Sequence, residues 1–401
     1  MKKWLNGIVR ILFAAGIAAF GLSFSGISFT DQVVVSQEAA KSWGFKLSAP
    51  RAFPVVAGDL NDMEGTVEIA FVGDDDTRSI RRLYVRQLGV GEKDCQPKPG
   101  LVHLLRRSNV RQLLFGLVLI LPLYPMGAIR WWLLLRARGI EVSVWRAFRL
   151  AMVGNFFNFC LPGTTGGDLV KAYYAARRSD RRADTLMSII VDRVTGLLGM
   201  IIFAGVAGLF MLSDPVVRRV TAVVAFGLLG LLIGGAVYFV PALRRRLGVE
   251  WVLMRLPGRR LFARIDAAAI AYRDHGTILA VAVGMSVLIH MTLSIGTAVV
   301  AFALGMQIEF AVLLNVVPIL FMASAIPLAY QGMGLREPLA TGMILNPPLA
   351  TANHIVGMLL MVTVFQVFYA LFGALFLLKG DIHMHPGTDP VASDERATET
   401  G

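Results

Sequence analysis

The chain has 401 residues, of which 56% are hydrophobic and only 16% are charged. Soluble domains usually carry about 25% charged residues, so this composition argues against a soluble protein. The net charge of +12 is compatible with nucleic-acid binding. However, the basic residues lie at the ends of apolar runs, which is typical of membrane proteins, and we expect no nucleic-acid partner.

A membrane-spanning helix needs ~20 mostly apolar residues. Six runs predict such helices: 11–29, 113–135, 195–212, 220–240, 278–304 and 356–378. The first run follows two lysines and an arginine, so it is either a signal anchor or a cleavable signal peptide. We favour a signal anchor over 1–29, because the run is long and its small-residue cleavage pattern is poor. Either alternative places the next segment on the extracytoplasmic side of the membrane.

That next segment, 30–105, is the one long polar stretch in the chain. Residues 66–72 alternate between apolar side chains and polar or small ones, which predicts a β-strand. Residues 73–76 read as a turn and 80–88 as a return strand. The three consecutive aspartates of the turn could bind a cation, but a solvated tip is the commoner role. We therefore predict a small, β-containing extracytoplasmic insert.

Arginines are concentrated in three connections, 136–149, 177–182 and 242–275, whereas 213–219 holds two and 305–309 none. Cytoplasmic loops carry an excess of Lys and Arg. This rule predicts a multi-pass protein of a bacterial cytoplasmic membrane with both termini in the cytoplasm.

Two further apolar stretches, 147–162 and 310–328, are shorter and end in proline and glycine. Non-helical backbone at membrane depth must be buried in protein or line a wet cavity. Interruptions at matching places in two halves of a transporter point to its central site. We therefore predict two re-entrant segments in inverted repeats, with 147–175 entering from the cytoplasmic side and 310–348 from outside. The alternative is a pair of ordinary loops at the membrane surface.

The broken segments and the charges near them supply the candidate site. Ionisable residues at membrane depth are costly, and they either pair with one another or serve a pathway. The residues expected to bind a lipid head group are Asn155, Asn158, Asp168, Lys171, Asp192, Arg193, Gln331, Arg336 and Glu337. The residues expected to act as hinges are Pro162, Gly163, Gly166, Gly167, Pro327, Gly332 and Gly334. For Asp192 and Arg193, an ion pair that locks helices together is the competing interpretation.

Other polar residues receive structural interpretations. Arg130 precedes two tryptophans, and we interpret it as an interfacial anchor. His290 in an apolar run could relay protons, although a hydrogen-bonded packing histidine is the commoner case. We expect no disulfide between Cys95 and Cys160, no metal site and no cofactor, since neither a GxxxxGK[ST] nor an HExxH pattern occurs.

At the broken segments the chain resembles the lysylphosphatidylglycerol synthase transmembrane-region family, also called flippase-like or UPF0104 proteins. The matching motifs are Leu161-Pro162-Gly163, Gly166-Gly167-Asp168, Lys171-Ala172-Tyr173-Tyr174, Val191-Asp192-Arg193 with Gly196-Leu197, and Gly332-Met333-Gly334-Leu335-Arg336-Glu337. The resemblance covers roughly 105–380. It implies an integral membrane domain with inverted repeats and re-entrant helices. Members that carry an aminoacyl-transferase domain move aminoacylated phospholipid between leaflets, and others are linked to glycolipid or isoprenoid-lipid processing.

Two departures limit what the resemblance implies. Only about 20 polar residues follow the last apolar run, so we expect no soluble synthase domain and no aminoacyl transfer. Lys171 stands where many relatives have arginine, which keeps the charge but weakens bidentate phosphate contact. The expected organisation is a signal anchor at 1–29, an insert at 30–105, a flippase-like domain at 106–380 and a disordered tail at 381–401.

The function that we predict is translocation of a charged or glycosylated lipid between leaflets, with membrane lipids as partners. Lys171 and Arg336 would meet phosphate, while Asp168, Asp192 and Glu337 would balance them or meet a cationic head group. One alternative is a non-transporting membrane partner of a lipid-modifying enzyme. The other is a membrane-embedded transferase acting on lipid head groups.

Overall fold

A computed structural model describes most of the chain between residues 29 and 378. The described residues are 29–57, 66–74, 78–84, 95–98, 100–160, 166–176, 182–210, 212, 215–248, 255, 266–267, 269–323, 332, 334–345 and 349–378. Several sequence predictions lie outside them: nearly all of the 1–29 anchor, the 381–401 tail, and the residues Pro162, Gly163, Pro327 and Gln331.

The described part contains five helical stretches that are long and apolar enough to cross a membrane. They correspond to α4 (Val110–Ile120) with α5 (Leu123–Ala137), α8 (Arg182–Leu209), α9 (Pro215–Phe239), α13 (Gly276–Ala303) and α16 (Ala352–Leu378). All five were predicted from apolar run length, and the sixth predicted run falls in undescribed residues. The prediction of a predominantly helical, multi-pass membrane protein is therefore confirmed.

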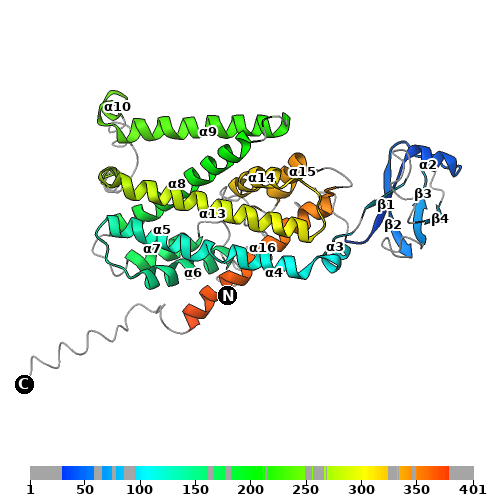
Figure 1. The fold of residues 1–401 in the computed structure, drawn as a ribbon, viewed down its shortest axis with the longest axis horizontal. Helices are drawn as coiled ribbons and strands as arrows, with labels where there is room; N and C mark the ends of the chain where they lie inside the picture. The colour runs from blue at the N-terminus through cyan, green and yellow to red at the C-terminus, as the bar shows by residue number, and fades with distance from the viewer. Residues whose placement is uncertain are drawn as a thin grey trace, which may run out of the picture.

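Two pairs of shorter helices occupy the positions of the predicted broken segments. In the first pair, α6 (Val144–Cys160) packs closely on α7 (Gly166–Ala176). A Cβ atom added at Gly167 would lie 1.8 Å from the Gly154 carbonyl oxygen, so only glycine permits this approach. In the second pair, α14 (Phe310–Ala323) packs on α15 (Arg336–Ile344). Figure 1 shows the two pairs in opposite halves of the helical bundle.

The helices of the two halves make similar contacts. In the first half α5 packs on α6 and α8, and in the second half α13 packs on α14 and α16. The halves also contact each other reciprocally, because α8 packs on α14 and α16 packs on α6. α9 lies at the edge of the bundle against α8 (Figure 1), with only 6% of its apolar span buried compared with 56% for α16.

A five-stranded antiparallel sheet precedes the bundle. Its strands are β1 (Gln32–Val35), β2 (Arg51–Ala57), β3 (Thr66–Val72), β4 (Arg78–Tyr84) and β5 (Gln96–Lys98), in the order β4-β3-β2-β1-β5. The short helix α2 (Gln37–Ser42) accompanies it, and α3 (Leu101–Arg107) leads into α4. Phe71 on β3 lies in the centre of a small apolar core with Phe53, Phe45 and Trp43.

The sheet confirms a small β-containing region and adds to it. The strand predicted at 66–72 has those bounds, while the return strand predicted at 80–88 is β4, observed at 78–84. The other three strands were not predicted, because β1 has only four residues and both β2 and β5 contain a proline, which weakens a strand pattern.

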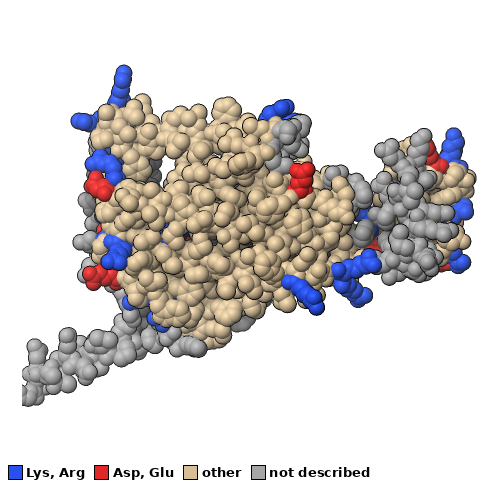
Figure 2. All heavy atoms as spheres, viewed as in Figure 1, with Lys and Arg blue, Asp and Glu red and all other residues tan. Residues whose placement is uncertain are grey.

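The two ends of the helical bundle differ. The sheet lies beyond α3 at one end, while the short helices α10 (Pro241–Arg246) and η2 (Arg273–His275) lie at the opposite end (Figure 1). Figure 2 shows charged side chains gathered at both ends and a broad uncharged belt between them. Such a belt is what a protein surrounded by lipid presents to the hydrocarbon.

Candidate functional site

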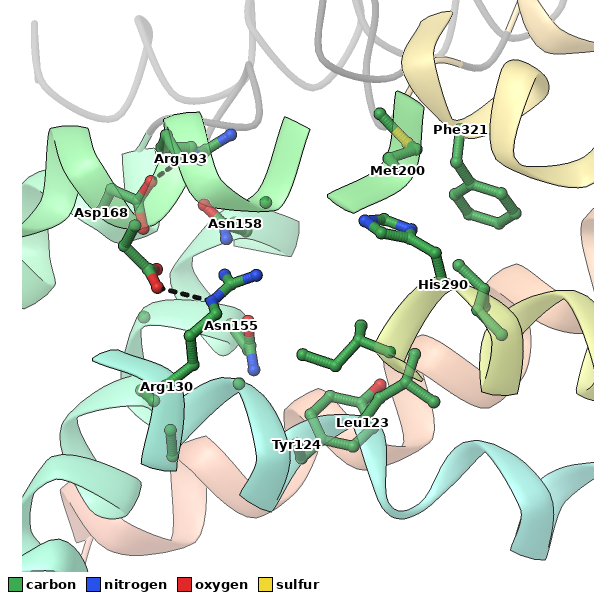
Figure 3. A pocket seen from close by; sticks show the side chains of 18 of the residues that line it. Leu123, Tyr124, Arg130, Asn155, Asn158, Asp168, Arg193, Met200, His290 and Phe321 are labelled. Atoms are coloured by element: carbon green, nitrogen blue, oxygen red, sulfur yellow. Dashed lines mark hydrogen bonds and ion pairs between the residues drawn. The ribbon is translucent and has the colours of Figure 1, made fainter. Parts of the chain in front are cut away.

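A cavity of about 670 Å³ lies within the bundle and is partly open. Its walls come from α5, α6, α7, α8 and α13, with Phe321 near the end of α14 and Gln366 on α16. Six predicted residues line it together: Asn155, Asn158, Asp168, Lys171, Asp192 and Arg193. Figure 3 shows that the charged and amide side chains gather on one side, facing His290, Met200 and Phe321.

Asp192 on α8 is held by two cations from two other helices. Its Oδ1 accepts a 2.8 Å hydrogen bond from Nε of Arg130 on α5, and its Oδ2 accepts a 3.4 Å hydrogen bond from Nζ of Lys171 on α7. Arg130 also donates from Nη1 to the Ser286 hydroxyl on α13, over 2.7 Å. This arrangement corrects the interpretation of Arg130 as an interfacial anchor, because its guanidinium points into the bundle and lines the cavity.

Lys171 is buried between this carboxylate and an aromatic ring. Its Nζ lies 4.1 Å from the centroid of the Trp131 ring, a cation–π contact. The Trp131 indole in turn donates to the Ser188 hydroxyl over 3.1 Å. These contacts fix the ammonium group at the cavity wall, with the Asp192 carboxylate on one side and the Trp131 ring on another.

Asp168 and Arg193 form a second ion pair, between α7 and α8. Asp192 and Arg193 therefore do not pair with each other, although they are neighbours in sequence. Their ion pairs do join helices, as the competing interpretation expected, but all of the paired groups also line the cavity. The same charged groups therefore both hold helices together and face the cavity.

The amide side chains complete the polar wall. Asn158 on α6 accepts a 2.8 Å hydrogen bond from the Gly167 backbone N–H, and this bond ties the start of α7 to α6. Asn155 lies one turn earlier and lines the cavity (Figure 3). Gly166 and Gly167 form the first residues of α7, so two predicted hinge residues begin the helix that carries Asp168 and Lys171.

His290 on α13 lies across the cavity from these groups (Figure 3). Its Nδ1 atom is inaccessible to solvent and has no hydrogen-bond partner in the described structure. The ring nevertheless hydrogen-bonds the Gly196 backbone, so the interpretation of His290 as a hydrogen-bonded packing histidine holds for one ring nitrogen but not for Nδ1.

The charged residues that line the cavity carry an excess of positive charge. Among the described residues the cations are Arg130, Lys171 and Arg193 and the carboxylates are Asp168 and Asp192, so three minus two leaves +1. Buried charge without compensation is costly. The cavity is thus better suited to an anionic group than to a cationic one.

Arg336 and Glu337 form a separate cluster at the start of α15. Neither lines the cavity, although the Arg336 guanidinium lies 5.3 Å from the centroid of the Phe321 ring, which does. Glu337 accepts a 2.6 Å hydrogen bond from the Gly334 backbone N–H. Gly332 and Gly334 have φ values of 75° and 86°, the left-handed region that favours glycine, so these two predicted hinges shape the turn before α15.

In the described residues, no cluster of three or more His, Cys, Asp or Glu side chains could hold a metal ion. Cys95 is buried and Cys160 is exposed, and no disulfide joins these two described residues.

The fold and this cavity define a class: helical multi-pass membrane proteins with a charged cavity inside the bundle. Residues 100–373 match the family described as the lysylphosphatidylglycerol synthase TM region, and the chain belongs to that family.

A UPF0104 membrane protein of Pyrococcus horikoshii is 25% identical over 115 residues. That match covers 28% of this chain and 34% of the relative, so it spans about a third of the relative's length. No solved structure matches.

Proposed function

We propose that this protein is a lipid translocase, which moves a charged or glycosylated lipid between the leaflets of a bacterial cytoplasmic membrane. The observation that carries the proposal is the charged cavity within an apolar bundle. The head group would occupy the cavity while the acyl chains remain in the surrounding lipid. Its volume of about 670 Å³ falls within the usual range for small-molecule sites.

The charge arrangement supports transport rather than chemistry on the lipid. Each carboxylate at the cavity already accepts hydrogen bonds from a cation: Asp168 from Arg193, and Asp192 from Arg130 and Lys171. A general base or nucleophile needs a carboxylate that is free to meet the substrate. We therefore propose that the chain binds and moves a head group without modifying it.

The packing of the two halves supports an alternating mechanism. The reciprocal contacts of α8 with α14 and of α16 with α6 are those expected of two inverted copies. Under the proposed orientation, α6 and α7 enter from the cytoplasmic side and α14 and α15 from outside. Flexing at Gly166, Gly167, Gly332 and Gly334, with the other predicted hinges, would expose the cavity to each leaflet in turn.

The test is lipid translocation by the purified protein in vesicles. A trace of head-group-labelled anionic phospholipid is placed in both leaflets, and an impermeant quencher is added outside. The protein should accelerate loss of the protected inner-leaflet signal. Arg130→Gln should slow this rate at least tenfold, because it removes a lining cation. No acceleration with anionic, zwitterionic or glycosylated lipids would contradict the proposal.

The chain offers a matched control for this variant. Arg138, the residue that follows α5, also donates to a carboxylate of α8, that of Asp184, at 2.7 Å, and the two side chains are 17% and 19% exposed. The corresponding values for Arg130 and Asp192 are 2.8 Å, 13% and 11%. Only the latter pair lines the cavity. If transport depends on the charges of the cavity, Arg138→Gln should preserve it. If transport depends only on ion pairing near the α5–α8 contact, Arg138→Gln should slow it as Arg130→Gln does.

The β-sheet favours a second candidate, a non-transporting partner of a lipid-modifying enzyme. Among the described strands β4 lies at one edge of the sheet, and its Ile80 and Tyr84 side chains are 67% and 53% exposed. An open edge with apolar side chains is a common protein-binding surface. Co-purification of an enzyme with the wild type but not with Ile80→Lys, together with no transport, would favour this candidate.

A further inference from the structure

Arg336 is a buried cation that forms no ion pair with the described residues. Its side chain is only 1% exposed, at the start of α15 and against α16. Its Nη2 donates a 3.2 Å hydrogen bond to the Thr363 hydroxyl, and its Nε has no hydrogen-bond partner. No carboxylate of the described residues forms an ion pair with it. A buried guanidinium is normally paired with an anion.

The first half of the bundle offers a comparison. There, Lys171 on the short helix α7 meets the Asp192 carboxylate on the long helix α8. In the second half, Arg336 on the short helix α15 meets only a hydroxyl on the long helix α16. The Thr363 hydroxyl donates its own hydrogen to the Leu359 carbonyl over 2.8 Å, so it can only accept from Arg336. The second cation is held in place but not neutralised.

The neighbouring groups offset this charge only in part. Glu337 attracts the guanidinium electrostatically but forms no ion pair with it, and its Oε2 accepts from the Gly334 backbone N–H. The free N–H groups at the start of α15 add partial positive charge near Arg336. Phe321 contributes a cation–π contact, and the same ring lines the main cavity. The Phe321 ring thus touches both the guanidinium and the main cavity.

We propose that Arg336 is a second anion-binding station, which takes the phosphate of an anionic lipid head group after or before it occupies the main cavity. Its place on a lipid's path rests on the function proposed above. The planar guanidinium, with a free Nε beside a terminal nitrogen, suits bidentate contact with two phosphate oxygens. Rotation of the Phe321 ring would connect the two positions. The substrate class is therefore a lipid whose head group carries a phosphate and a net negative charge.

The test is the binding stoichiometry of a soluble short-chain phosphatidylglycerol to the full-length protein in detergent micelles. Thr363→Asp is the decisive variant, because it places a carboxylate where the first half has Asp192 and so satisfies Arg336 internally. It should retain the fold and bind one fewer equivalent, or bind the last equivalent at least tenfold more weakly. Thr363→Asn has the same shape without the charge and should bind like the wild type. Arg336→Gln should lose the same equivalent as Thr363→Asp.

Unchanged stoichiometry and affinity in Thr363→Asp would overturn the station. Competition experiments distinguish binding of a lipid head group from binding of free phosphate. Glycerol phosphate should displace the lipid poorly. Displacement by inorganic phosphate at equal concentration would show that the site takes free phosphate instead. Vesicle transport by the same proteins separates the two proposals. If the wild type transports lipid but Thr363→Asp binds lipid as the wild type does, only the proposal for Arg336 is refuted. If Thr363→Asp loses one equivalent but the wild type transports no lipid, only the translocase proposal is refuted.

Discussion

Arg130 on α5 donates its Nε hydrogen to Oδ1 of Asp192 on α8 at 2.8 Å, and both side chains line the cavity. Lys171 approaches the other oxygen of the same carboxylate. One carboxylate therefore holds two cations from two helices beside a space large enough for a head group. The relationship predicts both how the bundle is stabilised and how the cavity attracts its ligand.

Replacing Asp192 should destabilise the protein. Asp192→Asn leaves Arg130 and Lys171 buried without their shared counter-charge, and breaking a buried pair in this way costs about 3–5 kcal/mol. The unfolding temperature in detergent should fall clearly below that of the wild type. Asp184→Asn removes only one pairing, with Arg138, and should have a smaller effect. Equal effects of the two variants would argue against a special role for Asp192.

The close approach of α6 and α7 should not tolerate a methyl group. Gly167→Ala places a Cβ 1.8 Å from the Gly154 carbonyl oxygen, so the hairpin must open, at a cost of about 1–3 kcal/mol or more. Gly205→Ala on α8 is the control, because its nearest atom would be 3.7 Å away. It should stabilise its helix by up to ~1 kcal/mol. Thermal unfolding should thus show shifts of opposite sign, and a neutral Gly167→Ala would contradict the observed packing.

His290 provides a test that separates stability from function. Its Nδ1 is buried without a partner, while the ring's hydrogen bond with the Gly196 backbone would be lost, so His290→Leu should change the free energy of unfolding by no more than about 1 kcal/mol. If the ring meets a head group, the vesicle transport rate should nevertheless fall. A variant that loses stability and transport in parallel would indicate a packing role instead.

The proposed orientation can be measured with an impermeant maleimide on intact cells. Cys160 is exposed and is first replaced by serine, while Cys95 is buried. Tyr84→Cys in β4, where the side chain is 53% exposed, should then be labelled from outside. Arg246→Cys in α10 should be labelled only after the membrane is permeabilised. The reverse pattern would contradict the positive-inside assignment.

Apolar run length predicted the spanning helices well, because lipid demands about 20 apolar residues whatever the fold. Apolar run length did not predict the polar ends of these helices. For example, α8 begins at Arg182, which is 13 residues before the predicted run at 195–212. The missed turns carry Asp184, Asp192 and Arg193, whose charges lower local hydropathy but are paired in the structure. Pairing partners on other helices are not visible in a hydropathy pattern.

The site was predicted in part for a similar reason. Intramembrane charge and broken helices identified six residues that line one cavity, but they also grouped Arg336 and Glu337 with them. Neither residue lines the cavity, and Arg336 instead contacts the Phe321 ring, an arrangement that sequence spacing does not encode. Arg130 was missed although the signal was present, because a lone arginine within an apolar run indicates a buried partner as readily as an interfacial anchor.

The most direct test of lipid translocation is a leaflet-resolved lipid analysis of cells that lack this protein. Our account predicts that one anionic or glycosylated lipid accumulates in the leaflet where it is made. The wild-type gene and Arg138→Gln should restore its distribution, and Lys171→Gln should not. An unchanged distribution of every lipid class, with total lipid composition also unchanged, would contradict the account.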